Sequence, residues 1–173
     1  NALEDQLKAI GRIEQELEDQ AGMIELGEAE KDQTVVTEAE QALAKLKTEA
    51  ARRELEALLS GEADSFDTFL EVHAGAGGTE SQDWANMLLR MYLRWADKRG
   101  FEATIMELSA GEVAGIKGAT LHIKGEYAFG WLRTEIGVHR LVRKSPFDSG
   151  NRRHPSFTAV SVPPETDDHT HIA

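Results

Sequence analysis

Apolar residues in the first part of the chain recur every three or four positions, and this period constrains the fold more than any other feature. The stripe runs through two segments separated by a polar stretch near residues 27–33, with the members Leu3, Leu7, Ile10, Ile13, Leu17, Ala21 and Ile24 and then Val36, Ala39, Leu43, Leu46, Ala50 and Ala57. Such spacing places one apolar face on each of two long helices. We therefore expect an antiparallel helical hairpin or part of a small bundle, which serves as a packing element or as a docking arm.

The helical period ends near Ser60–Ser65, and a strand-like alternation of Phe66, Thr68, Leu70 and Val72 follows it. A change of period accompanied by turn-forming residues marks a domain boundary. We predict an acidic helical domain over residues 1–62 and an α+β domain over residues 65–173, and we expect the second domain to be incomplete.

The second domain is predicted to be a β-sheet with one long packed helix. Thr79 and Gln82 form a capping-box pair at the start of that helix, and Gly100 can end it in a left-handed conformation. Its apolar face consists of Trp84, Leu88, Met91, Tyr92 and Trp95. Further strands are expected near residues 102–108, 118–125, 137–143 and 156–162, with a short helix near residues 127–134. This order of elements is typical of the α+β class.

The formal net charge of −12 argues against a general nucleic-acid binder, because polyanion binding rests on clustered Lys and Arg. The charges are unevenly distributed, however. Residues 1–64 carry 17 acidic and 7 basic side chains, whereas residues 133–153 carry six basic and two acidic ones. The sequence has no cysteine and no apolar run long enough to span a membrane. We expect a soluble protein of the cytoplasm or of an organelle matrix, with a small basic patch in its second half.

The stretch Gly137–His154 places a short hydroxyl, a rigid proline, several rings and several cations near one predicted loop. Its centre, Ser145-Pro146-Phe147, would on its own be an exposed turn more often than a binding site. The neighbouring side chains favour RNA, because single-stranded bases are stacked on rings and hydrogen-bonded along their edges. The Ser145 hydroxyl can donate or accept, so it can meet O6 of guanine or N6 of adenine. The side chains predicted to hold phosphates, without reading sequence, are Arg143, Lys144, Arg152 and Arg153.

The run Gly75-Ala76-Gly77-Gly78 lies between a predicted strand and the start of the long helix, where backbone N–H groups can bind anions. The plain interpretation is a tight turn that requires glycine. A nucleotide-phosphate site is the alternative, although Glu80 stands where a dinucleotide fingerprint needs glycine, and the Gly-Lys-Ser/Thr ending of a P-loop is absent. Binding of ATP or a dinucleotide that Gly78→Asp abolishes would support this alternative.

Residues 73–85, 90–96 and 137–154 together closely resemble the bacterial-type class I peptide chain release factors, and the resemblance covers most of the chain. It implies recognition of a stop codon in the ribosomal decoding site. The implied partners are the ribosome, the mRNA stop codon and ribosomal RNA, with no cofactor, metal or membrane. The implied codon-binding residues are Gly77 and Glu80 for the first base, Ser145, Pro146 and Phe147 for the second, His154 stacked beside the third, and Val142. In the branch of the family that carries this tripeptide, UGA and UAA are accepted.

Two departures from the family pattern bear on function. Pro155 stands where the family usually has threonine, and proline offers neither a hydroxyl nor an N–H to the third base. The Gly-Gly-Gln tripeptide with which the family triggers peptidyl-tRNA hydrolysis is absent, since Thr79 follows the one Gly-Gly pair. We therefore expect no catalytic residue and a fragment of a release factor. The alternative is a release-factor-like RNA- or ribosome-binding module that has lost peptide release. The tail Asp167–His171 is assigned no metal role.

Overall fold

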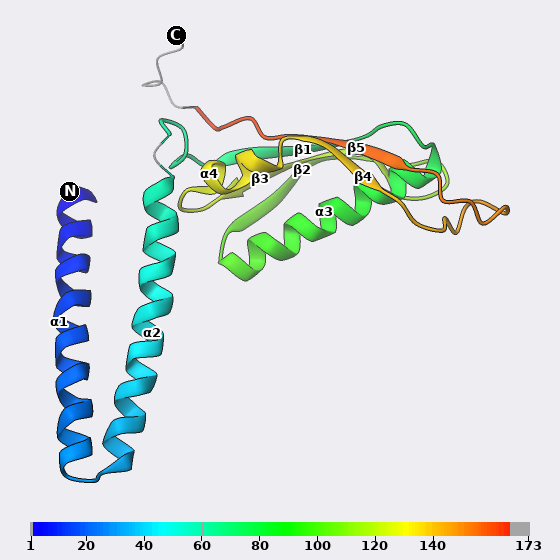
Figure 1. The fold of residues 1–173 in the computed structure, drawn as a ribbon. Coiled ribbons are helices and arrows are strands. Elements are labelled where there is room, and N and C mark those ends of the chain that lie inside the picture. Colours follow the sequence, from blue (N-terminus) through cyan, green and yellow to red (C-terminus); the bar gives the residue numbers. More distant parts are fainter. Residues whose placement is uncertain (1, 60, 167–173) are drawn as a thin grey trace. The chain divides into compact units, whose positions relative to one another are not determined.

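The structure, a computed structural model, describes residues 2–59 and 61–166, and it divides into two compact units, Asn1–Leu58 and Leu59–Ala173. The first unit consists of α1 (Ala2–Ala29) and α2 (Gln33–Leu58), which run antiparallel (Figure 1). Its buried apolar side chains are Val36, Ala39 and Leu46. The helical hairpin predicted from the apolar stripe is confirmed. Neither these helices nor any other described helix is long and apolar enough to cross a bilayer.

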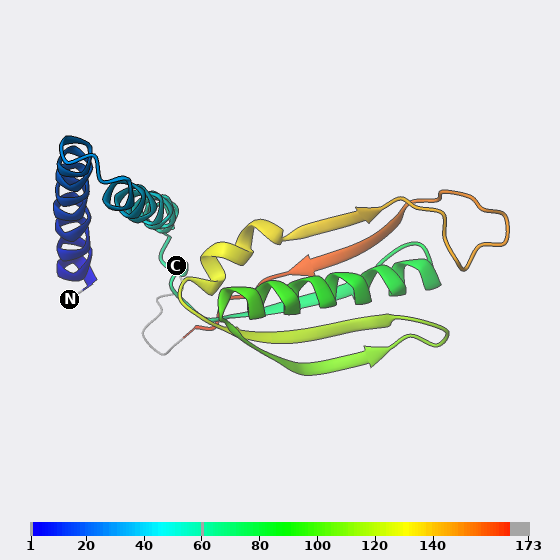
Figure 2. The same ribbon diagram turned by 90° about the horizontal axis from the view of Figure 1, so that it is seen from below.

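The second unit is built on a five-stranded sheet in which every neighbouring pair is antiparallel. In spatial order the strands are β2 (Glu102–Ala110), β3 (Ile116–Lys124), β1 (Thr68–Ala74), β5 (Ser156–Ser161) and β4 (Gly137–Leu141). One face of the sheet carries α3 (Thr79–Arg99), and α4 (Ala128–Leu132) with the 3-10 turn η1 (Arg133–Glu135) precedes β4 (Figure 2). The predicted α+β architecture is confirmed. β4 is an edge strand, paired with β5 alone.

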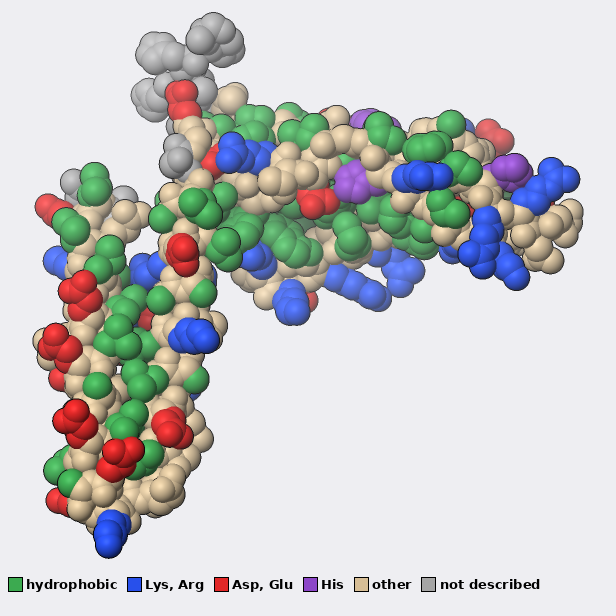
Figure 3. Space-filling model, in the orientation of Figure 1, with side chains coloured by type: hydrophobic (Ala, Val, Ile, Leu, Met, Phe, Trp, Pro, Cys, Tyr) green, Lys and Arg blue, Asp and Glu red, His purple; other side chains and the backbone are tan. Residues whose placement is uncertain are grey.

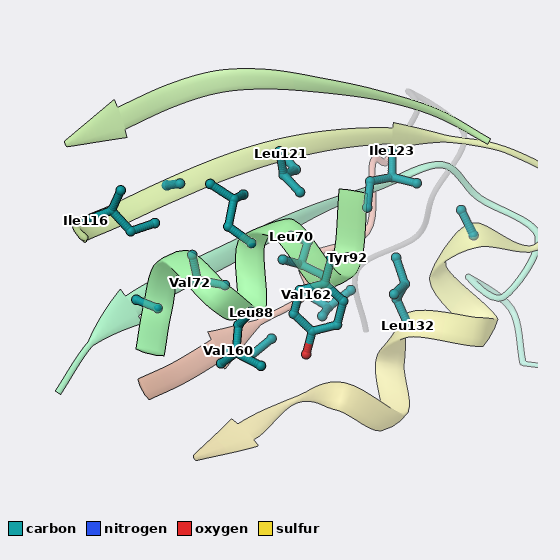
Figure 4. Close-up of a cluster of buried hydrophobic side chains, with 14 residues drawn as sticks. Leu70, Val72, Leu88, Tyr92, Ile116, Leu121, Ile123, Leu132, Val160 and Val162 are labelled. Carbon is teal, nitrogen blue, oxygen red and sulfur yellow. The ribbon is translucent and has the colours of Figure 1, made fainter. Parts of the chain in front are cut away.

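The core of the second unit lies between α3 and the sheet (Figure 4). Side chains alternate between the two faces of a strand, and those of Leu70, Val72, Leu121 and Ile123 on the central strands are fully buried on the α3 side. The helix contributes Ala85, Leu88, Leu89, Tyr92 and Ala96. Burial of one Leu or Val side chain stabilises the fold by about 1.5–3 kcal/mol. The start of α3 is thereby held at a fixed place relative to β1 and β5.

The two ends of α3 form in different ways. At its C-terminal end, Gly100 adopts the expected left-handed conformation, with φ of 75°, and its N–H bonds to carbonyls of the preceding turn. At the start, the N-cap residue is Gly78 and no side chain caps the helix. The predicted capping box of Thr79 and Gln82 is therefore wrong. The chain leaves β1 through Gly77 and Gly78, both with positive φ, so the helix begins directly at Thr79, one residue beyond the position from which a side chain caps.

Candidate nucleic-acid interface

The loop of residues 142–155 connects β4 to β5 and carries most of the predicted site residues. β4 ends at Leu141, earlier than predicted, and β5 begins at its register partner Ser156. The start of α3 lies against the base of this loop, because the Phe157 N–H donates to the Ala76 carbonyl at 3.1 Å. A Cβ at Gly77, where φ is 127°, would lie 2.8 Å from Ser156 Oγ, so only glycine fits there. Figure 2 shows the loop extending from the end of the sheet at which α3 begins.

An open pocket of about 310 Å³ lies between the start of α3 and the β4–β5 loop. It is lined by Gly77, Thr79, Glu80, Ser145, Phe147, Asp148, Arg152, His154, Pro155 and Ser156. The structure thus brings six of the predicted site residues together from two distant parts of the sequence. The other predicted residues, Val142, Arg143, Lys144, Pro146 and Arg153, lie in the same loop outside this lining.

The Ser145 hydroxyl is held by a carboxylate from the facing helix. Its Oγ donates to Oε2 of Glu80 at 2.7 Å and accepts the backbone N–H of Phe147 at 3.1 Å. One lone pair of the hydroxyl oxygen therefore remains for a ligand. These two hydrogen bonds hold the hydroxyl oxygen at the pocket wall, with its proton directed at Glu80.

Arg143 connects the loop to α3 through two carboxylates. Its Nε and Nη2 donate to the two oxygens of Glu80 at 2.5 and 3.2 Å, and Nη2 also donates to Asp83 at 2.6 Å. The hydrogen bonds from Arg143 to Glu80, with a smaller contribution from Ser145, hold the pKa of the Glu80 carboxyl below its ordinary value although burial opposes the shift. The Glu80 carboxylate likewise raises the pKa of Arg143. The carboxylates thus engage three of the five N–H donors of the Arg143 guanidinium, and its Nη1 lies 3.8 Å from Met87 Sδ.

The far side of the loop is ordered by Asp148. Its Oδ1 accepts the N–H of Gly150 at 2.9 Å, and this hydrogen bond, with a further contribution from Arg152, lowers the pKa of the Asp148 carboxyl. Lys144, Arg152 and Arg153 remain exposed. Figure 3 shows Lys and Arg side chains gathered at the end of the second unit that carries this loop. The loop therefore presents cations to solvent around a pocket whose walls are mixed in charge.

Trp84 makes a structural contact with β4 that the sequence does not reveal. Its indole Nε1 on α3 donates to the backbone carbonyl of His139 at 3.0 Å, and the His139 ring is in turn bonded to the Glu135 carbonyl at 2.8 Å. Because β4 is an edge strand with a single strand partner, this bond ties the strand that enters the loop directly to the helix that forms the other wall of the pocket. Such a bond between an indole and a main-chain carbonyl has no sequence signature.

Within residues 2–59 and 61–166 the structure holds no group of three or more His, Cys, Asp or Glu side chains that could hold a metal ion. The acidic and histidine-containing tail from Asp167 lies outside the described residues.

Comparison with known proteins gives matches over nearly the whole chain. A family model described as the PCRF domain matches residues 1–160. The chain is 58% identical over 168 residues to peptide chain release factor 2 of Paramagnetospirillum magneticum, and the aligned region covers 97% of this chain and 45% of that protein. It is 57% identical over 170 residues to peptide chain release factor 2 of Roseobacter denitrificans, with 98% of this chain and 46% of that protein covered.

A solved structure, RF2 of Thermus thermophilus, matches with a TM-score of 0.73 and 41% identity. The match covers 98% of this chain and 48% of the Thermus chain. The chain thus spans a little under half the length of these relatives.

Proposed function

Because the chain belongs to the PCRF-domain family, we propose that it acts in translation termination and recognises the stop codons UGA and UAA on the ribosome. In this proposal residues 1–62 are an acidic helical domain, and residues 65–173 are a codon-recognition domain. The partners are the ribosome, the mRNA stop codon and ribosomal RNA, and the compartment is the cytoplasm. The observation that carries the proposal is the pocket into which α3 and the β4–β5 loop bring Glu80, Ser145, Phe147 and His154.

The Ser145 hydroxyl supplies a physical route to accepting two purines at the second codon position. While the hydroxyl donates to Glu80, its Oγ can accept a hydrogen bond from the N6 amino group of adenine. To meet O6 of guanine, the hydroxyl must rotate and donate to the base instead. Glu80 then loses one hydrogen bond but keeps both bonds from Arg143, so its carboxylate stays satisfied. Arg143 is thus proposed to support both orientations of the hydroxyl.

The other residues are assigned roles consistent with their places. Gly77 and Glu80, at the start of α3, are proposed to read the first base, and His154 to stack beside the third, a contact worth about 1–3 kcal/mol in single-strand binding. Pro146 and Phe147 shape the second-base position, with Val142 at the edge of the site. The exposed side chains proposed to hold phosphates are Lys144, Arg152 and Arg153.

We propose that this chain recognises a codon without supplying the hydrolytic step, since its sequence contains no Gly-Gly-Gln tripeptide. The alternative, a related module that has lost peptide release, shares the same pocket. Sequencing the gene beyond Ala173 distinguishes the two, because a reading frame that continues into Gly-Gly-Gln excludes the alternative.

Ser145→Ala tests the proposed reading of the second base. Binding of the chain to ribosomes programmed with UAA or UGA should weaken by roughly three- to tenfold, the value of one neutral hydrogen bond. Binding to ribosomes programmed with the sense codon UGG should change little. Ser149→Ala is the matched control, because Ser149 is exposed in the same loop and makes no side-chain hydrogen bond among the described residues. Equal losses at stop and sense codons would reject the proposal.

A further inference from the structure

The Thr79 hydroxyl is a polar group of the pocket with no assigned task. The sequence predicts it as a helix cap, but Gly78 occupies the N-cap position and no side chain caps α3. Thr79 instead lines the same pocket as Ser145 and His154. Within the described part of the chain, its hydroxyl makes no hydrogen bond. The hydroxyl is therefore available to a molecule that enters the pocket.

Three of the six other polar side chains that line the pocket already have partners inside the protein. Ser145 donates to Glu80, Glu80 accepts from Arg143, and Asp148 accepts from Gly150. A ligand that bonds to any of these groups must displace or share an existing hydrogen bond, which offsets much of the gain. Thr79 can bond to a ligand without that loss.

The walls of the pocket favour a neutral, flat group over a phosphate. The carboxylates of Glu80 and Asp148 both line it and outnumber the single guanidinium of Arg152, so a phosphate close to Thr79 would meet net repulsion. The Phe147 ring and Pro155 give it apolar walls against which a base can lie. A hydroxyl can donate to a base carbonyl or accept a ring N–H. The ligand chemistry that fits is the edge of an unstacked nucleobase.

We propose that Thr79 is a further base-contacting residue, whose hydroxyl hydrogen-bonds the edge of the first codon base. The choice of base follows from its position between Gly77 and Glu80, and the inference rests on the function proposed above. Thr79 places its hydroxyl on the α3 wall of the pocket, whereas Pro155 in the loop wall brings no donor.

Two substitutions test this inference in binding of the chain to ribosomes programmed with UAA. Thr79→Val keeps the branched shape and removes only a hydroxyl that has no partner among the described residues, so folding should be unchanged. It should weaken binding by about two- to tenfold, and Thr79→Ser, which restores a hydroxyl, should bind like the wild type. Wild-type affinity of Thr79→Val would overturn the inference.

An mRNA whose first codon position is abasic separates a base contact from a phosphate contact. If the hydroxyl bonds to the first base, Thr79→Val should cause no further loss on this mRNA, whereas it should still weaken binding when the third position is abasic. An undiminished loss on the first-position abasic mRNA, with a shallower salt dependence, would indicate a phosphate contact and overturn the inference. A wild-type chain with no preference for stop codons would instead reject the proposed function.

Discussion

Replacing Glu80 by glutamine removes the charge that joins the two sides of the pocket while it keeps the size of the side chain. The Glu80 side chain is 11% exposed and that of Arg143 30%, so their ion pair is largely shielded from water. A hydrogen bond between charged groups contributes about 1.5–3 kcal/mol, and Arg143 retains its second carboxylate, Asp83. We expect Glu80→Gln to lower the free energy of unfolding of the second unit by about 2 kcal/mol near neutral pH, or roughly 10 °C in Tm.

The loss should depend on pH with a defined sign. The folded-state pKa of Glu80 lies below its ordinary value of 4.5, so the ionised carboxylate adds stability that is fully present above that value. The added stability disappears as the pH falls through the lowered folded-state pKa. Glutamine has no such dependence. The difference between wild type and Glu80→Gln should therefore be largest at about pH 7 and should shrink towards about pH 3.

Urea unfolding followed by tryptophan fluorescence measures this difference. All three tryptophans, Trp84, Trp95 and Trp131, belong to the second unit, so the signal does not report on the helical hairpin. Glu71→Gln is the matched control, because among the described residues Glu71 pairs only with the exposed His73, at 3.6 Å, and such surface pairs contribute about 0–1 kcal/mol. A Glu80→Gln variant as stable as wild type, or a deficit of constant size from neutral to acidic pH, would refute the reasoning.

Two further predictions concern the frame of the pocket. Gly77→Ala should lower the free energy of unfolding by about 1–3 kcal/mol, because the new Cβ would clash with Ser156 at a position of positive φ. Gly78→Ala should cost less, because the space around that Cβ is open. Equal losses of the two variants in urea unfolding would contradict this. Trp84→Phe should weaken stop-codon binding about two- to tenfold by releasing β4, and it should speed amide hydrogen exchange in that strand. The matched variant Trp95→Phe, in the same helix, should leave both measurements near the wild-type values.

The sequence predicted the elements of the fold well because their signals are local. A period of three to four residues marks a helix and alternation marks a strand, so the hairpin, α3 and the sheet follow from neighbouring residues. The left-handed end at Gly100 is equally local. The cap of α3 was predicted wrongly because threonine is a residue type that often caps a helix. In the structure the N-cap is Gly78, in a turn where Ser156 closely approaches Gly77.

The connections inside the site depend on contacts between distant segments, which explains why the sequence missed them. Nothing near Arg143 in the chain indicates that Glu80 and Asp83 on another element will hold it. The residue types suited to RNA could be recognised from chemistry alone. Which of them face the pocket, and which are tied to a neighbour within the protein, depends on how β4, β5 and α3 are packed together.

The β4–β5 loop leaves the sheet at Leu141 and returns at Ser156, two residues that face each other in the antiparallel ladder. Its whole length is therefore an excursion between adjacent anchor points, and insertions or deletions within it need not shift the pairing of any strand. Such an arrangement would let the recognised ligand change through replacement of this one loop, while the sheet stays intact. The hydrogen bonds from Arg143 to Glu80 and Asp83 limit that freedom, since any replacement loop would still need a cation near its start to pair with these carboxylates of α3.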